Sequence, residues 1–214
     1  MSVIRYPGQV DRGRRRRLVG LTASVATALV DTIAVSIWLA LVVIGTRTAL
    51  TALLGLGILL VGAFLRSRIF GSAVGERRSI RRPGRLATAV AVATGWVAWI
   101  FVAEWIGSVL GMVVGGVVLG ACLLFAFFAE RVAVIDGDVT RSERPSLVSP
   151  LVLALGSSVL LASLWFTTWT TSLTVSGGSR PLLFTIDAVH LGVLLFALCA
   201  FLAHRRRVRR YLGV

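Results

Sequence analysis

The stretch 86-LATAVAVATGWVAWIFVAEWIGSVLGMVVGGVVLGACLLFAFFA-129 decides the fold of this chain. Its 44 residues contain one charged side chain, Glu104. As a single helix they would be about 66 Å long, which is roughly twice the thickness of a bilayer's hydrocarbon core. The stretch must therefore fold back, and charge, glycine and serine coincide at 103-AEWIGS-108. The sequence predicts two membrane spans here, at 86–103 and 109–129, with Glu104 solvated at the membrane interface.

The composition of the whole chain excludes a soluble domain. Hydrophobic residues make up 57% of its 214 residues, and the mean hydropathy is +0.89. A soluble core cannot absorb so much continuous apolar sequence, whereas a bilayer can. Four further apolar runs lie at 18–45, 48–65, 151–171 and 181–203. The sequence therefore predicts an all-α polytopic membrane protein with six transmembrane helices in three antiparallel hairpins.

The distribution of arginine predicts the orientation of these spans. All 23 basic residues are arginine, and 21 of them lie in the segments 1–17, 66–85, 130–149 and 204–214. The two others, Arg47 and Arg180, lie in turns on the opposite side. Because basic residues accumulate in cytoplasmic loops, both termini are expected in the cytoplasm. We expect a basic N-terminal segment (1–17), a bundle (18–203) and a basic tail (204–214), in the plasma membrane of a prokaryote.

The net charge of +14 could indicate either a nucleic acid or a membrane surface as the partner. Nucleic-acid proteins carry basic and aromatic residues on a soluble surface, and this chain has no such surface. No nucleic acid is therefore expected, and we expect the arginines to contact anionic lipid head groups, each contributing about 1 kcal/mol. The arginines assigned to these contacts are Arg14, Arg15, Arg16, Arg17, Arg77, Arg78, Arg81, Arg82, Arg205, Arg206 and Arg207.

A stripe of small and polar residues runs along the first span. Ser24, Thr27, Ala28, Asp31 and Ala34 lie three or four residues apart and so share one helix face. An aspartate near the middle of a span costs roughly 2.5–3.5 kcal/mol in insertion estimates. Asp31 is therefore expected to face the interior of the bundle.

A second ionisable pair lies in the last predicted span, within 185-TIDAVHLGVLLF-196. Asp187 and His190 are three residues apart and would share one helix face. If the first and sixth spans pack together, Asp31 would join them in one polar cluster, where a carboxylate neutralises an imidazolium. Such a cluster is either a proton or cation relay or a structural knot that fixes helix register. The Asp-x-x-His pattern has low specificity, so the structural interpretation is favoured.

Glycines recur at four-residue spacing in the fourth span, as Gly107, Gly111 and Gly115 and again as Gly116 and Gly120. Small residues at this spacing let helix backbones approach closely in a membrane. The glycines therefore mark either a dimer interface or a contact with a neighbouring helix of the same chain. The second interpretation is favoured.

The remaining residues point to no cofactor. Cys122 and Cys199 both lie in apolar runs without metal-ligand spacing, so no metal site is expected.

The first functional interpretation is a structural or accessory membrane component, which assembles with itself or with another membrane protein. The second is a proton- or cation-coupled transporter of a small solute that uses Asp31, Asp187 and His190. An intramembrane enzyme is a distant third, because no nucleophile and base share a motif, and no enzymatic activity is expected.

Overall fold

The computed structural model describes residues 7–74, 83–134, 147–175 and 182–212. The helices are α1 (Pro7–Leu39), α2 (Ala49–Val74), α3 (Pro83–Ile106), α4 (Ser108–Val134), α5 (Val148–Trp165) and α6 (Ala188–Leu212), with a π-helical turn at Ala40–Ile44 and two strands, β1 (Thr170–Val175) and β2 (Leu182–Asp187). In this described part of the chain, six helices are long and apolar enough to cross a membrane. The prediction of six apolar spans is thereby confirmed, and the chain is a multi-pass membrane protein.

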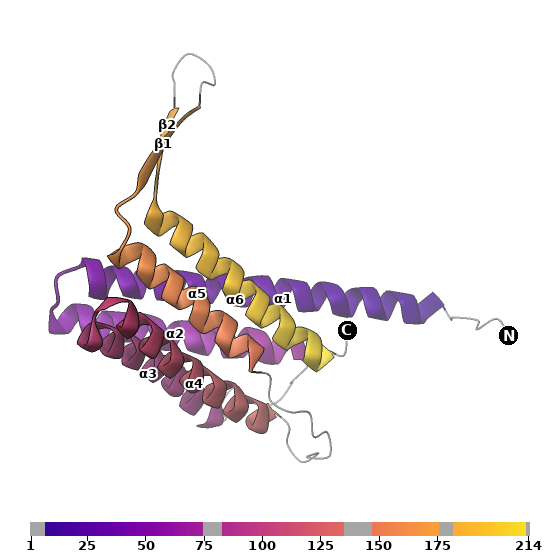
Figure 1. Ribbon diagram of the computed structural model, residues 1–214. Coiled ribbons are helices and arrows are strands. Elements are labelled where there is room, and N and C mark those ends of the chain that lie inside the picture. Colours follow the sequence, from indigo (N-terminus) through magenta and orange to yellow (C-terminus); the bar gives the residue numbers. More distant parts are fainter. Residues whose placement is uncertain (1–6, 75–82, 135–146, 176–181, 213–214) are drawn as a thin grey trace.

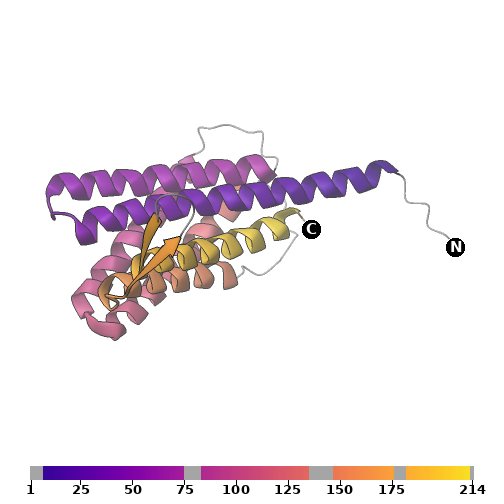
Figure 2. The ribbon, with the colours of Figure 1, turned by 90° about the horizontal axis from the view of Figure 1, so that it is seen from above.

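The helices form one bundle in which each helix packs against the next along the chain and α6 closes against α1 (Figures 1 and 2). Helix α1 packs against α2 on one side and α6 on the other, while α3 packs against α4 and α5 against α6. An aromatic group in the core links α1, α3 and α6. Trp96 lies with its ring centroid 6.3 Å from that of Trp38, 5.4 Å from Trp99 and 5.9 Å from Phe196.

Glycines bring helix pairs into close contact. A Cβ atom added at Gly111 would lie 2.5 Å from the carbonyl oxygen of Ala103 on α3, and one at Gly115 would lie 2.9 Å from that of Trp99. On the same helix, Gly116 faces Ser158 of α5. Four of the five predicted packing glycines thus face helices of this chain, since Gly120 also faces α5, whereas a Cβ atom added at Gly107 would meet nothing within 4 Å.

The fold-back predicted from the apolar stretch is a very short turn. Helix α3 ends at Ile106 and α4 begins at Ser108, so Gly107 alone separates them. Both Gly107 and Ser108 have a left-handed backbone, with φ of 66° and 57°. Glycine takes this conformation without strain, whereas serine there costs on the order of 1–3 kcal/mol.

Several boundaries differ from the sequence prediction, among them the start of α1 at Pro7 rather than residue 18. Helix α2 runs to Val74 and α6 to Leu212, so parts of the segments expected to be loop and tail are helical. Residues 182–187, expected at the start of the sixth span, form β2 instead, paired with β1 in an antiparallel hairpin from Thr170↔Asp187 to Val175↔Leu182. The segments TTSLTV and LLFTID are rich in threonine and β-branched or aromatic residues, which favour strands. The hairpin extends away from the bundle (Figure 1), so the chain is not purely α-helical.

Candidate functional site

The polar stripe of α1 faces the inside of the bundle. Ser24, Thr27, Ala28 and Ala34 are buried together with Asp31, whose side chain is 8% exposed. The hydroxyls of Ser24 and Thr27 donate hydrogen bonds to carbonyl oxygens one turn earlier in α1. Their polar groups are thus satisfied within the helix. Asp31 instead bonds to side chains of two other helices.

Asp31 meets a cation and an imidazole from two other helices. Its Oδ2 atom lies 2.8 Å from Nε2 of His204 on α6 and 3.5 Å from Nη1 of Arg66 on α2. The side chains of His204 and Arg66 are both 2% exposed. We call these three residues the charged centre. It joins α1, α2 and α6 through one carboxylate oxygen.

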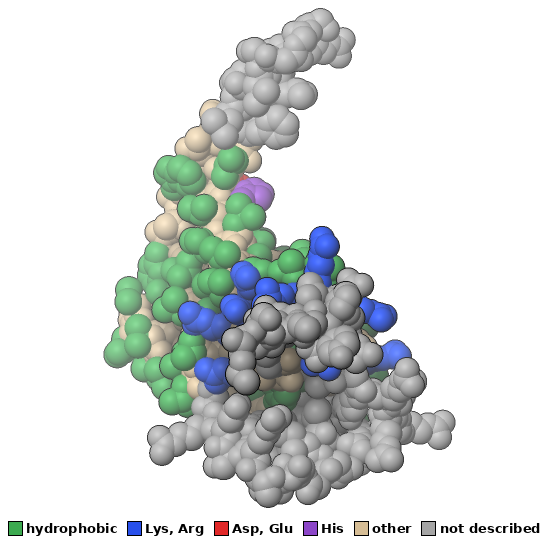
Figure 3. Space-filling model, turned by 90° about the vertical axis from the view of Figure 1, so that its right-hand side faces the viewer, with side chains coloured by type: hydrophobic (Ala, Val, Ile, Leu, Met, Phe, Trp, Pro, Cys, Tyr) green, Lys and Arg blue, Asp and Glu red, His purple; other side chains and the backbone are tan. Residues whose placement is uncertain are grey.

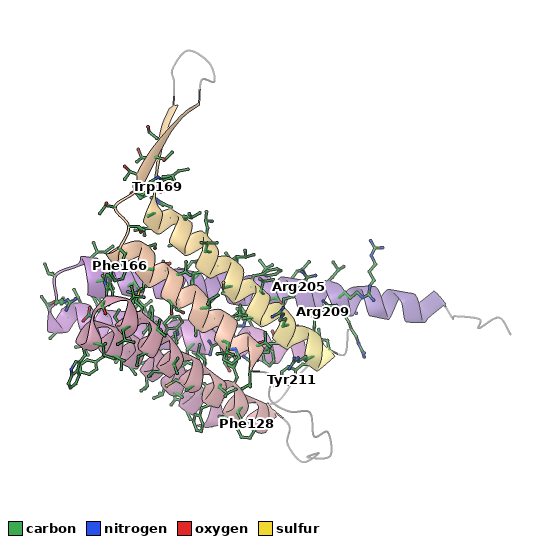
Figure 4. The ribbon with its side chains drawn as sticks, in the orientation of Figure 1. Phe128, Phe166, Trp169, Arg205, Arg209 and Tyr211 are labelled. Carbon is green, nitrogen blue, oxygen red and sulfur yellow. The ribbon has the colours of Figure 1, made fainter. Side chains whose placement is uncertain are left out.

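The charged centre lies toward the arginine-rich end of the bundle. Arg66 comes 17 residues after the start of α2 and His204 comes 16 residues after the start of α6, which places them about 26 and 24 Å along their helices. Figure 4 shows Arg205, Arg209 and Tyr211 at the same end of α6. In a membrane, charge is less costly towards the ends of the spans than at the centre of the bilayer.

A second buried arginine lies beside the charged centre. The guanidinium carbon of Arg207 is 4.1 Å from the ring centroid of Phe70 on α2 and 4.4 Å from that of Phe127 on α4. Arg66 lies 5.4 Å from the same Phe127 ring. We call Arg207, Phe70 and Phe127 the aromatic brace. Arg207 is 6% exposed, which corrects its expected role as a lipid head-group contact: its side chain turns inward between two aromatic rings.

Asp187 and His190 lie elsewhere and do not join Asp31. They are close to each other, because the backbone N–H of Asp187 donates to Nδ1 of His190 at 3.1 Å. Their side chains are 45% and 62% exposed, so neither carries a buried charge. His190 and His204 are 14 residues apart on α6, a separation of about 21 Å along the helix axis. The expected three-residue cluster fails because residues 182–187 form a strand, which leaves this pair at the first turn of α6.

The other predicted lipid contacts divide into two groups. Arg14, Arg15, Arg16 and Arg17 are exposed near the start of α1, and Arg205 and Arg206 are exposed on α6. Exposed arginines gather at this end of the molecule (Figure 3). The remaining four, Arg77, Arg78, Arg81 and Arg82, lie outside the described residues.

Arg66 and His204 were missed in the sequence because they begin segments that look like a basic loop and a basic tail. A helical signal was nevertheless present at both places. Arg66 lies between Ala63 and Phe70, and His204 lies midway between Ala200 and Val208, at spacings of three or four residues. All of these neighbours are buried. The apolar face of each helix therefore continues past its first basic residue.

The arrangement limits the chemistry that the site can perform. A carboxylate bonded to an imidazole can hold a proton on the ring, whereas an arginine stays charged at any physiological pH. Among the described residues no group of three His, Cys, Asp or Glu side chains could hold a metal ion.

No family model matches the chain, and no curated protein or solved structure is significantly similar to it.

Proposed function

We propose that this protein is a structural or accessory component of a prokaryotic plasma membrane, in which the charged centre fixes the packing of α1, α2 and α6. The observation that carries this proposal is the sharing of one Asp31 oxygen between His204 and Arg66. Each of the three side chains comes from a different helix, and each is at least 92% buried, since the largest exposed fraction is the 8% of Asp31.

Membrane helices gain specificity from such contacts. Lipid tails are as apolar as leucine, so the hydrophobic effect does not choose between one helix register and another. A buried ion pair does choose, because sliding α2 by one turn would separate Arg66 from Asp31 and leave a buried guanidinium without its carboxylate. The burial of the centre also favours a structural role, since a carboxylate that carries a proton across the membrane needs an aqueous path.

The proposed topology has three antiparallel hairpins with both termini in the cytoplasm. The positive-inside rule supports it, together with the exposed arginines of α1 and α6 at one end of the bundle. The same arginines support contacts with anionic lipid head groups.

A proton-coupled transporter is the second candidate, and the direct contact of Asp31 with His204 is the observation that favours it. A carboxylate and an imidazole 2.8 Å apart are suited to exchanging a proton. This candidate now rests on Asp31 and His204, because Asp187 and His190 are exposed at the far end of α6.

Paired variants of Asp31 and Arg66 separate the two candidates. Asp31→Asn leaves Arg66 buried beside a neutral amide, and we expect the free energy of unfolding to fall by on the order of 3 kcal/mol. Adding Arg66→Gln to Asp31→Asn should restore part of this loss, because no buried charge is then unpaired. Asp187→Asn is the matched control: its carboxyl is 45% exposed, and we expect a change within about 0.5 kcal/mol. The free energy of unfolding of the wild type and of these three variants is measured in mixed detergent micelles.

Proton uptake into liposomes that contain the same proteins provides the second measurement. We expect no proton flux above that of empty liposomes in the wild type. A flux that disappears in Asp31→Asn, while this variant keeps the stability of the wild type, would contradict the structural proposal and support the transporter.

A further inference from the structure

A pocket opens at the end of the bundle opposite the charged centre. Its volume is about 740 Å³, which falls within the range of small-ligand sites. It lies where the turn before α2, the end of α3, the start of α4 and the end of α5 meet. We call it the aromatic pocket, and the side chains that define it are Arg47, Phe101, Glu104, Trp105, Trp165 and Phe166.

One ion pair forms part of its wall. Nη2 of Arg47 lies 2.7 Å from Oε1 of Glu104, and Nη1 lies 3.3 Å from Oε2. The Arg47 side chain is 65% exposed and that of Glu104 is 30% exposed. A guanidinium has five N–H donors and a carboxylate has about four acceptor sites, so this pair leaves capacity on both groups. Glu104 is therefore not simply solvated, as the sequence suggested, but is held at the pocket by Arg47.

Two aromatic pairs form the other walls. The ring centroids of Phe101 and Trp105 are 5.5 Å apart, and those of Trp165 and Phe166 are 6.4 Å apart, both in edge-to-face geometry. Aromatic faces carry negative electrostatic potential and attract alkylammonium groups, tryptophan most strongly. A carboxylate flanked by these rings suits a cation.

The same pocket also offers a place for an anionic group, beside Arg47. An arginine such as Arg47 is suited to phosphate, since its planar guanidinium matches two phosphate oxygens. The pocket is also lined by Gly107 and Ser108, at the start of the 27-residue helix α4. The first N–H groups of a helix have no partner within it, and they favour an anion beside Arg47.

The balance of charge decides the class of ligand. Arg47 and Glu104 together carry no net charge. A simple anion would be repelled by Glu104, and a simple cation would be repelled by Arg47. A ligand that carries both an ammonium and a phosphate satisfies both residues, and it also places its ammonium against the rings.

The position of the pocket decides the source of the ligand. The pocket lies at the ends of four helix segments that are apolar enough to span a membrane, where head groups lie. Trp105 at its rim is 78% exposed and is of the residue type that gathers at the membrane interface. We propose that the aromatic pocket binds the head group of a zwitterionic phospholipid such as phosphatidylethanolamine. The phosphate contacts Arg47, and the ammonium contacts Glu104 and the aromatic walls.

Titration of the purified full chain with phosphatidylethanolamine and with phosphatidylglycerol, followed by native mass spectrometry, tests the proposal. We expect Arg47→Gln, Glu104→Gln and Trp105→Leu each to weaken phosphatidylethanolamine binding about tenfold. Trp169→Leu is the matched control, because Trp169 is 53% exposed at the same end and does not line the pocket. It should bind like the wild type, and none of the four variants should change phosphatidylglycerol binding at the arginine-rich end.

Three outcomes would overturn the proposal. They are equal binding of phosphatidylethanolamine by wild type and pocket variants, equal loss in Trp169→Leu, and preference of the pocket for phosphatidylglycerol. Glycerophosphoethanolamine, the soluble head group, distinguishes the source of the ligand: we expect it to compete at least about a hundredfold more weakly, and equal competition would contradict a lipid ligand.

A charge swap separates binding from folding. The double variant Arg47→Glu with Glu104→Arg restores an ion pair and should recover the thermal stability of the wild type. It moves each charge to the wrong side of the pocket, so lipid binding should stay at least about fivefold weaker. Full binding by the swapped protein would contradict the proposed orientation of the head group.

Discussion

Asp31 and Asp187 show how strongly the surroundings of a residue decide its role. Both are aspartates in segments that look apolar in the sequence. Asp31 is 6% exposed and contacts His204 and Arg66, whereas the Asp187 side chain is 45% exposed and lies beside an imidazole that is 62% exposed. A buried charge without a partner costs several kcal/mol, so Asp31 needs its partners and Asp187 does not.

A single glycine, Gly192, tests the close contact between α5 and α6. A Cβ atom added at Gly192 of α6 would lie 2.7 Å from Cβ of Ser163 on α5, so Gly192→Ala forces the two helices apart. We expect a loss of roughly 1–3 kcal/mol in the free energy of unfolding. Gly57→Ala on α2 is the control, since nothing lies within 4 Å of its added Cβ. It should leave stability unchanged or raise it by up to about 1 kcal/mol. Equal losses in both variants would contradict the close α5–α6 contact.

Among the elements, α6 shows three different environments along its length. Its start carries the exposed Asp187–His190 contact, its second turn packs on α5 through Gly192, and its C-terminal half carries His204 and Arg207. Through the aromatic brace, Arg207 of α6 contacts both Phe70 of α2 and Phe127 of α4. Helix α4 has its main contacts with α3 and α5, and the brace adds a contact with α6 at this end.

Two adjacent phenylalanines of α4 test the brace. Phe127→Leu removes the ring that stacks on Arg207 and Arg66, and a desolvated cation–π contact contributes about 2 kcal/mol. Phe128→Leu makes the same chemical change at a side chain that is 50% exposed and points away from the bundle (Figure 4). We expect the first variant to lose about 2 kcal/mol and the second less than about 0.5 kcal/mol. Thermal unfolding in detergent measures both, and equal losses would show that Phe127 has no special role.

For the whole molecule, the proposed orientation places the two ends of the bundle on opposite sides of the membrane. In a background of Cys122→Ala and Cys199→Ala, single cysteines at Thr168 and Arg206 probe the two ends, because both positions are exposed. We expect a membrane-impermeant maleimide to label Thr168→Cys in intact cells and Arg206→Cys only after permeabilisation. The reverse pattern would invert the proposed topology.

The sequence by itself determined that the chain has six apolar helices and where most of them lie. Residues 86–129 are too long for one span and turn at Gly107, within the predicted segment 103–108. The buried stripe of α1 follows from the helical period alone. These features are local, because hydropathy, helix rise and glycine act over a few residues or a single span.

Only the tertiary structure decided which charges meet. Asp31 is 35 residues from Arg66 and 173 from His204, and no pattern within one span predicts either pairing. The same holds for the contact of Arg47 with Glu104, which are 57 residues apart. The positive-inside pattern assigned Arg66 and Arg207 to the cytoplasmic side, although each is buried against α4 in the structure. A charge in a membrane protein is placed by the partner that neutralises it, and that partner is known only once the helices have packed.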